Sequence, residues 1–172
     1  MIKPKLYILI GIPGSGKSTF CKKHLSHLPI ESRDEHRLKF LKPEDNFFDV
    51  EHDAYQSYIS AIASHLKNKQ DCVADATHLN FKSRNQLIHR LYREGLSLKD
   101  YNIVMIYFDI PLGICLERNA LRTGRAFVPE KTVIEMKGRL RKPNNNEFSN
   151  LINLTIVGVE GNDKQEQGIY HQ

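Results

Sequence analysis

Short apolar runs alternate with longer amphipathic segments along the whole chain. The apolar runs predict buried strands, and the run at 102–109, NIVMIYFD, is the strongest of them. The segment 50–67 has an apolar residue at every fourth position from Val50 to Leu66, which indicates a helix with one buried face. We expect strands at 6–10, 29–32, 72–76, 102–109 and 151–159, and helices at 17–27, 34–41, 50–67, 81–94, 111–121 and 129–141.

The alternation of strands with helices is typical of an α/β fold, in which a parallel sheet is flanked by helices on both faces. The 172 residues are enough for one full hydrophobic core, and the sequence contains no internal repeat. We therefore expect about five strands in a single domain, residues 1–160. The remaining residues, 161–172, are polar (GNDKQEQGIYHQ) and are expected to form a flexible tail.

Composition narrows the class of protein. No apolar run approaches the roughly 18–20 residues that a membrane span needs, so no membrane contact is expected. Cys21, Cys72 and Cys115 lie far apart in the sequence, which indicates reduced thiols and a cytoplasmic protein. The sequence gives no sign of an obligate protein partner.

Positive charge is concentrated in one window of the chain. Residues 117–142 contain eight basic and three acidic residues, a net charge of +5 that equals the excess of the whole chain. Such a local excess indicates a polyanionic partner, either a nucleotide or a nucleic acid. A solvated basic helix face would give the same pattern, so charge alone leaves both interpretations open.

The segment GIPGSGKST, residues 11–19, gives the strongest chemical signal. It matches the phosphate-loop pattern G-x-x-x-x-G-K-[ST] between a predicted strand and a predicted helix. Its glycines let the backbone N–H groups face one point, where the helix N-terminus adds partial positive charge. Lys17 is expected to reach the β- and γ-phosphates, and Ser18 to offer its hydroxyl to Mg²⁺. ATP or GTP is predicted to bind through Gly11, Pro13, Gly14, Ser15, Gly16, Lys17, Ser18 and Thr19.

A second segment, ESRDEHR at 31–37, follows the second predicted strand and so lies at the same carboxyl edge of the sheet. Asp34 and Arg37 are three residues apart at the start of a helix and share a face. A carboxylate there can accept a hydroxyl proton, and an arginine can hold an anionic acceptor. A helix-terminal acid with a surface ion pair would show the same pattern, so the two interpretations are equally weighted.

A third segment, VADATHLN at 73–80, ends a buried strand in an acid. Asp75 occupies the place of a Walker-B carboxylate that orders Mg²⁺ and its waters. Thr77 and His78 follow in a loop at the same edge and are candidates for contact with the acceptor. A histidine in such a loop is as often a hydrogen-bonded structural residue, and we weigh that alternative equally for His78.

A fourth segment, ERNALRTGRAFVP at 117–129, brings arginines together around a glycine. Arg118 and Arg122 are four residues apart on one helix face, and Arg125 follows Gly124 in a loop. Mobile loops with arginines can close over a nucleoside triphosphate and neutralise the phosphoryl group in transfer. Generic surface charge is the alternative, but the position of the arginines in the most basic window favours a lid.

Taken in order, the four segments resemble the 5′-hydroxyl polynucleotide kinase family, the kinase module of phage and bacterial end-healing enzymes. GIPGSGKST is similar to its phosphate loop, SRDEHR to its S/N-[RS]-D-x-x-R segment and DATHLN to its D-x-T-N segment. ERNALRTGR…VP is similar to its RN-x-x-R lid and Val-Pro helix start. The likeness covers about residues 5–140. His78 stands where the family usually has asparagine, and no appended phosphatase or ligase domain is expected.

The resemblance implies a P-loop NTPase fold of the adenylate-kinase-like type with an arginine-bearing lid. It implies that Asp34 is the general base on a 5′-OH and that Arg37 holds the neighbouring phosphate of the acceptor. Lys17, Arg118 and Arg122 would bind and polarise the phosphates of ATP, with Mg²⁺ as cofactor. A nucleic acid 5′-OH end would then be the acceptor, DNA or RNA. A kinase of a small metabolite or nucleotide-sugar, and a nucleotide-binding module without transfer, are the alternatives.

Overall fold

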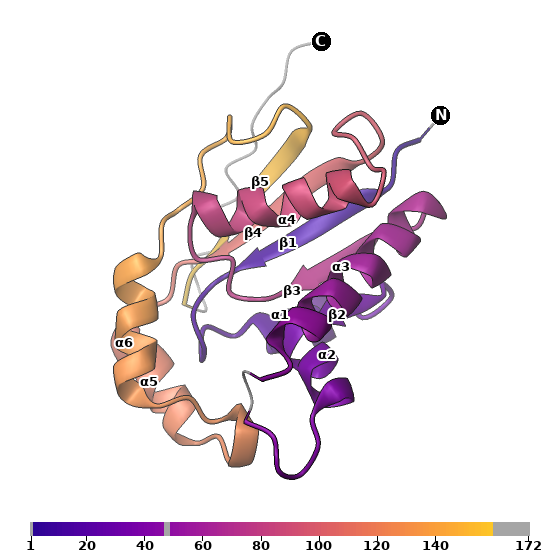
Figure 1. Ribbon diagram of the computed structural model, residues 1–172. Coiled ribbons are helices and arrows are strands. Elements are labelled where there is room, and N and C mark those ends of the chain that lie inside the picture. Colours follow the sequence, from indigo (N-terminus) through magenta and orange to yellow (C-terminus); the bar gives the residue numbers. More distant parts are fainter. Residues whose placement is uncertain (1, 47–48, 160–172) are drawn as a thin grey trace.

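One parallel sheet organises the computed structural model, which describes residues 2–46 and 49–159 (Figure 1). The strand order is β2-β3-β1-β4-β5, and every neighbouring pair is parallel. This sheet confirms the predicted fold class. The predicted flexible tail, 161–172, lies outside the described residues. The strands are β1 (Lys5–Ile10), β2 (Ile30–Ser32), β3 (Cys72–Asp75), β4 (Asn102–Phe108) and β5 (Leu151–Val157).

Helices cover the sheet and also flank the edge at which its strands end. Figure 1 shows α3 and α4 in front of the sheet, with α5 and α6 on one side of the carboxyl edge and α2 on the other. Helix α1 ends at His24 rather than at residue 27, because the chain must turn before Pro29 to enter β2. The helices are α1 (Lys17–His24), α2 (Arg33–Phe40), α3 (Glu51–Lys67), α4 (Phe81–Arg93), α5 (Leu112–Ala120) and α6 (Glu130–Arg139), with a 3₁₀ turn, η1, at Gly124–Ala126.

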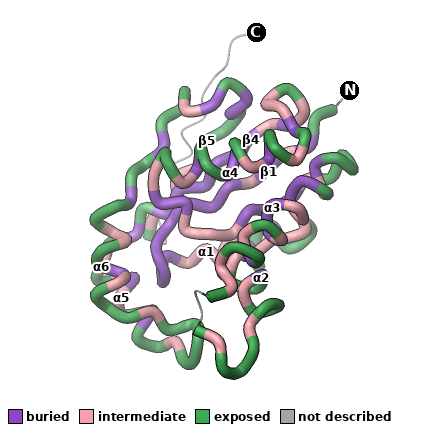
Figure 2. Tube along the Cα trace, in the orientation of Figure 1, coloured by how far each residue is buried: buried purple, intermediate pink, exposed green. Residues whose placement is uncertain are grey.

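The core lies along the central strands β1 and β4. Both strands have a neighbour on each side and helices above and below, so their side chains are buried almost without a break (Figure 2). The edge strand β5 differs, because Leu151 and Leu154 face inward while Ile152 is exposed. None of the described helices is both long and apolar enough to span a membrane.

All three cysteines are reduced and buried in this core. Burial raises the pKa of the Cys21 thiol to about 12 and that of Cys72 to about 12. Burial also raises the pKa of Cys115, although nearby Lys137 and Arg118 oppose the change. Since the thiolate is the reactive form, all three side chains are expected to be inert.

Strand register brings the sequence motifs to one edge. Ser32, the last residue of β2, pairs with Asp75, the last residue of β3. The backbone N–H of Gly11, directly after β1, donates to the carbonyl oxygen of Thr77 at 3.1 Å. The glycine loop, the carboxylate that ends β3 and the start of α2 are therefore neighbours in space.

A buried ion pair ties the segment after α6 to the rest of the domain. Arg84 on α4 is only 1% exposed, and its Nε donates to Glu147 Oε2 at 2.8 Å, with a second bond from its Nη2 to Oε1. Its Nη1 donates to the carbonyl oxygens of His78 (3.0 Å) and Arg141 (3.3 Å). One guanidinium thus joins α4, the loop before it and the chain that follows α6.

Glu147→Gln should destabilise the domain, because it leaves the Arg84 charge buried without a counter-charge. We expect the free energy of unfolding to fall by about 3 kcal/mol, measured by urea denaturation. The control is Glu135→Gln in the exposed Lys131–Glu135 pair (4.0 Å), which should cost less than about 0.5 kcal/mol. Equal losses of unfolding free energy in the two variants would show that the buried pair stabilises the domain no more than the exposed pair does.

Candidate active site

The glycine loop is shaped by two glycines in the left-handed region. Gly14 has φ 80° and Gly16 has φ 91°. A Cβ on Gly14 would lie 2.2 Å from the carbonyl oxygen of Cys115, so only glycine lets the loop lie against α5. Gly16 is also the N-cap of α1, which places the loop at the N-terminus of that helix.

Lys17 lies at the centre of the site's charges. Its Nζ donates to the carbonyl oxygens of Gly11 (2.8 Å) and Ile12 (3.2 Å). Burial lowers the pKa of the Lys17 ammonium, and the carboxylates of Asp75 and Asp34 oppose that change. Arg122 lowers it further from the side of the lid. Charged residues from the other three sequence segments therefore all influence the pKa of Lys17 in the glycine loop.

A buried hydroxyl in the glycine loop lacks a partner. The Ser15 side chain is 3% exposed, and its Oγ makes no hydrogen bond with any described residue. Buried polar atoms are nearly always paired, so an orphaned one at a helix N-terminus suits an anionic ligand. The residues present thus fit a bound phosphate group.

A hollow of about 640 Å³ continues from the glycine loop, between α1 and the ends of β4 and β5. Phe20 meets Phe108 edge-on, with ring centroids 5.4 Å apart, and lies 4.6 Å from the His24 ring. Sequence reasoning missed this hollow because its walls come from distant segments. The side chains that line it include those of Phe20, Lys23, His24, Phe108, Arg118 and Val157.

Asp75 ends β3 close enough to other carboxylates for their charges to act on it. Burial raises the pKa of the Asp75 carboxyl, Lys17 lowers it, and Asp34 and Glu35 raise it. Ser18, the second residue of α1, is exposed at the same edge. Carboxylate and hydroxyl oxygens beside further carboxylates form a donor set that fits a hard divalent cation.

The start of α2 carries the ion pair that the sequence suggested. Arg37 is bonded to Asp34 through Nη1, and its Nε donates to Glu51 Oε2 at 2.5 Å. The Asp34 side chain is 74% exposed, whereas that of Arg37 is largely covered. Arg33 also binds Glu51 and stacks over the Tyr55 ring at 4.6 Å. Sequence reasoning missed Glu51, which lies 14 residues beyond Arg37 on another helix.

His78 faces the core and not the acceptor side. Its ring is buried, Nδ1 donates to the Leu9 carbonyl oxygen at 2.7 Å, and Nε2 lies 3.3 Å from the Tyr58 hydroxyl. Both ring nitrogens are thus engaged, and the structural alternative describes His78 better than the expected acceptor contact. Its φ is 44°, a conformation that asparagine and histidine adopt more readily than most residues. The neighbouring Thr77 is only partly covered, and its backbone oxygen binds Gly11.

Three arginines of the proposed lid lie at different depths. Arg118 Nη1 is 3.5 Å from the Gly14 carbonyl oxygen, directly on the glycine loop. Arg122 Nη1 is 3.5 Å from the Ala126 carbonyl oxygen, and its charge acts on both Lys17 and Asp75. Arg125 lies on η1 and is exposed, and in the described part of the chain no hydrogen bond joins it to the glycine loop.

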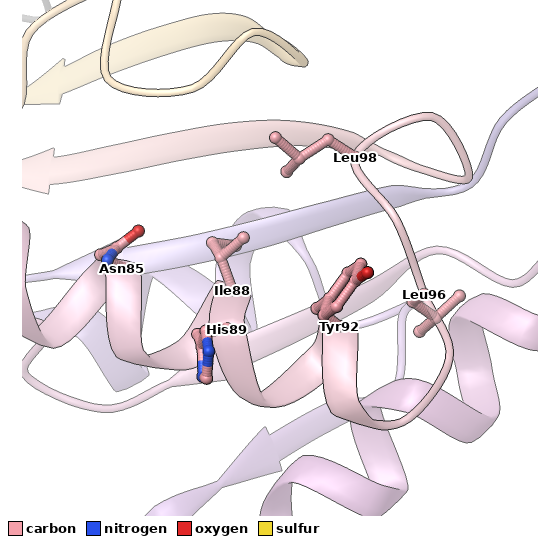
Figure 3. A pocket seen from close by; sticks show the side chains of 6 residues that line it. All are labelled: Asn85, Ile88, His89, Tyr92, Leu96 and Leu98. Atoms are coloured by element: carbon pink, nitrogen blue, oxygen red, sulfur yellow. The ribbon is translucent and has the colours of Figure 1, made fainter.

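A smaller hollow of about 210 Å³ lies between α4 and the segment that follows it (Figure 3). Figure 3 shows Asn85, Ile88, His89 and Tyr92 along α4. Leu96 and Leu98 complete the wall, which is mostly apolar. It contains none of the residues that the sequence motifs identified, so we place the chemistry at the glycine loop.

The comparisons with known proteins agree with this geometry. A model of the AAA domain family AAA_33 matches residues 6–143, which is most of the chain. The chain belongs to this family. The match and the parallel sheet give this AAA_33 protein the P-loop kinase fold, and a gluconokinase is among its structural neighbours. No match was found among curated proteins.

Solved structures similar to this AAA_33 protein include a chain that is much longer and chains of nearly equal length. A chain of the Pnkp1/Rnl/Hen1 RNA repair complex is 25% identical with a TM-score of 0.69, and the match covers 81% of this chain and 45% of that one. The protein thus spans less than half the length of that chain. The likeness confirms the resemblance to the kinase module of end-healing enzymes.

Two further solved structures match over nearly equal lengths but at lower identity. A gluconokinase from Sinorhizobium meliloti 1021 is 19% identical, with 91% and 85% of the two chains covered and a TM-score of 0.55. The tunicamycin resistance protein of Deinococcus radiodurans is 22% identical, with 88% and 86% covered and a TM-score of 0.55. At these identities the likeness shows the fold alone.

His78→Asn should make the protein less sensitive to acid. Burial lowers the pKa of His78 to about 4 from 6.5, so between pH 6.5 and 4 the unfolded chain takes up a proton that the folded chain does not. The wild type should lose about 3 kcal/mol of stability over this range for that reason. Asparagine does not titrate, so the variant should not show that loss in urea unfolding between pH 7 and 4.

The control for this prediction is Tyr58→Phe, which removes the hydroxyl next to the ring and keeps the buried histidine. It should retain the acid-linked loss of the wild type. A His78→Asn variant with the pH dependence of the wild type would contradict the assignment of that loss to His78.

Proposed function

We propose that this kinase transfers the γ-phosphate of ATP to the 5′-OH end of a polynucleotide. One observation carries the proposal. The exposed Asp34 carboxylate, paired with Arg37, acts electrostatically on both Lys17 and Asp75. A base with an anion-binding partner at the phosphate loop is what transfer to a hydroxyl beside a phosphate requires.

The donor nucleotide is proposed to lie along α1. Gly11, Pro13, Gly14, Ser15, Gly16, Lys17, Ser18 and Thr19 would hold its phosphates, and the hollow beside them would take the ribose and the base. Phe20 and Phe108 offer aromatic surface for a base there. Among the described residues no Asp or Glu lines this hollow. A guanine would therefore find no carboxylate for its N–H donors, which favours ATP over GTP.

Mg²⁺ is proposed to bind between Ser18 and Asp75. The described residues contain no group of three His, Cys, Asp or Glu side chains that could hold a metal by themselves. Mg²⁺ does not need such a cage, because it keeps several waters and shares ligands with phosphates. When bound, the ion supplies positive charge that neutralises the phosphate oxygens.

In the transfer step Asp34 accepts the proton of the acceptor hydroxyl. The hydroxyl oxygen forms a bond to the γ-phosphorus while the bond from that phosphorus to the β–γ bridging oxygen breaks, and ADP leaves. Lys17, Arg118 and Arg122 stabilise the negative charge that develops on the oxygens. Arg125 is proposed to join them from the exposed part of the lid. Arg37 would hold the phosphate next to the acceptor hydroxyl, and Thr77 would contact the acceptor.

A polynucleotide is favoured as the acceptor by charge and by likeness. Arg33 and Arg37 both pair with Glu51, and Arg37 also pairs with Asp34, so the charge argument rests on the window 117–142, which has a net charge of +5. The similar chain of known structure belongs to a complex named for RNA repair.

The location is proposed to be cytoplasmic. The three reduced, buried cysteines support a reducing compartment.

The proposal predicts label transfer from γ-labelled ATP to 5′-OH oligonucleotides of DNA or RNA. The panel should include 5′-phosphorylated oligonucleotides, gluconate, other sugars and nucleotide-sugars. Because phosphate contacts release counterions, transfer to an oligonucleotide should fall several-fold or more between about 50 and 200 mM salt. Transfer to a small hydroxyl compound with no transfer to any 5′-OH end would establish the alternative, a metabolite kinase.

Asp34→Asn should lower the rate of transfer by roughly 100-fold or more, because the amide cannot accept the hydroxyl proton. Binding of ATP, measured by calorimetry, should change little. Asp53→Asn is the matched control, since Asp53 is an exposed acid in the first turn of α3, and its rate should stay within about twofold. An Asp34→Asn enzyme with normal turnover would remove Asp34 from the role of base.

A further inference from the structure

A buried asparagine fixes the base of the arginine lid. Asn119 follows Arg118 on α5 and is only 2% exposed. Its Nδ2 donates to the Val128 carbonyl oxygen at 2.6 Å, and its Oδ1 accepts from the Val128 N–H at 3.1 Å. One carboxamide thus satisfies both backbone groups of Val128, as a neighbouring strand would.

These two bonds close the loop of residues 120–127 that contains Arg122 and Arg125. Val128 directly precedes Pro129, the N-cap of α6, so the bonds fix the point where the loop enters that helix. Inside the loop, the Arg122 N–H donates to the Asn119 carbonyl oxygen at 3.0 Å. Most of the loop is exposed (Figure 2), so packing against the core contributes little to its position.

Helix α5 itself is fixed to the glycine loop. Its Cys115 carbonyl lies against Gly14, and Arg118 lies 3.5 Å from the Gly14 carbonyl oxygen. Two consecutive residues of α5 therefore make contacts in two directions. Arg118 contacts the glycine loop, and Asn119 binds Val128 at the far end of the loop 120–127. An unbroken set of contacts runs from the phosphate loop to Val128.

We propose that Asn119 is a positioning residue that holds Arg122 at the phosphates of the donor nucleotide. The role of Arg122 rests on the proposed function, whereas the anchoring of the loop by Asn119 does not. The charge of Arg122 acts on Lys17 across the site, so a loop that leaves its anchor would withdraw that charge from the phosphates. Misplacement of about 1 Å at such a group is enough to slow transfer roughly 100-fold.

Two variants separate hydrogen bonding from shape. Asn119→Asp keeps the volume but loses the donor and sets a carboxylate against the Val128 carbonyl oxygen, and Asn119→Ala removes both bonds. Both should lower kcat/KM for transfer to a 5′-OH oligonucleotide by roughly 10- to 100-fold, with a higher KM for ATP. If either substitution affected only stability, kcat/KM and the KM for ATP would stay unchanged under conditions where the protein is folded.

The chain offers a matched control in a second buried asparagine. Asn150 Nδ2 donates to the Tyr101 carbonyl oxygen at 2.9 Å, at the opposite edge of the sheet where β4 and β5 begin. Asn150→Ala should lower the melting temperature like Asn119→Ala, because it also leaves a buried backbone group without a partner. Its kcat/KM should stay within about twofold of the wild type.

Limited trypsin digestion without nucleotide gives a readout that does not depend on activity. Cleavage after Arg122 and Arg125, followed by mass spectrometry, should be roughly tenfold faster in both Asn119 variants than in the wild type or in Asn150→Ala. Wild-type cleavage rates and kcat/KM in both Asn119 variants, or the same local change in Asn150→Ala, would overturn the proposal. Faster cleavage in the Asn119 variants, with no transfer to any 5′-OH end by the wild type, would support the anchor and count against the proposed acceptor.

Discussion

The contact between the glycine loop and helix α5 is the constraint on which the arrangement of the site depends. Gly14 leaves no room for a side chain because the Cys115 carbonyl oxygen occupies that space. The loop that would hold phosphates and the helix that begins the predicted lid are therefore in direct contact. A displacement at one is transmitted to the other, since close-packed groups have no slack in which to absorb it.

Charge around Lys17 follows from the same edge geometry. Parallel strands end together, so segments far apart in the sequence place Asp34, Asp75 and Arg122 around one ammonium. Charges of both signs meet there, so the buried ends of Lys17 and Asp75 are not isolated. Such a mixture of positive and negative side chains suits a highly charged ligand. A phosphate can pair with the positive groups and a cation with the carboxylates.

The sequence was enough to predict the sheet, its helices and the glycine loop, because each depends on contiguous residues. Apolar periodicity located β4 and α3 with nearly correct bounds. Residues that act across the fold were not predictable in this way. Glu51 meets Arg37 only because α2 and α3 pack together, and the hollow beside α1 needs the ends of two strands. The two interpretations of His78 could not be separated from the sequence, because the direction of its ring depends on a left-handed backbone conformation that no periodic pattern reveals.

The buried thiols have a practical consequence for solution experiments. Cys21, Cys72 and Cys115 are buried, and their pKa values are raised, so maleimide reagents should leave the native protein unlabelled. A single cysteine introduced on the exposed surface of the lid would then be the one site for a fluorophore. No cysteine then needs to be removed before labelling, and single-molecule fluorescence can test whether the proposed lid moves when a nucleotide binds.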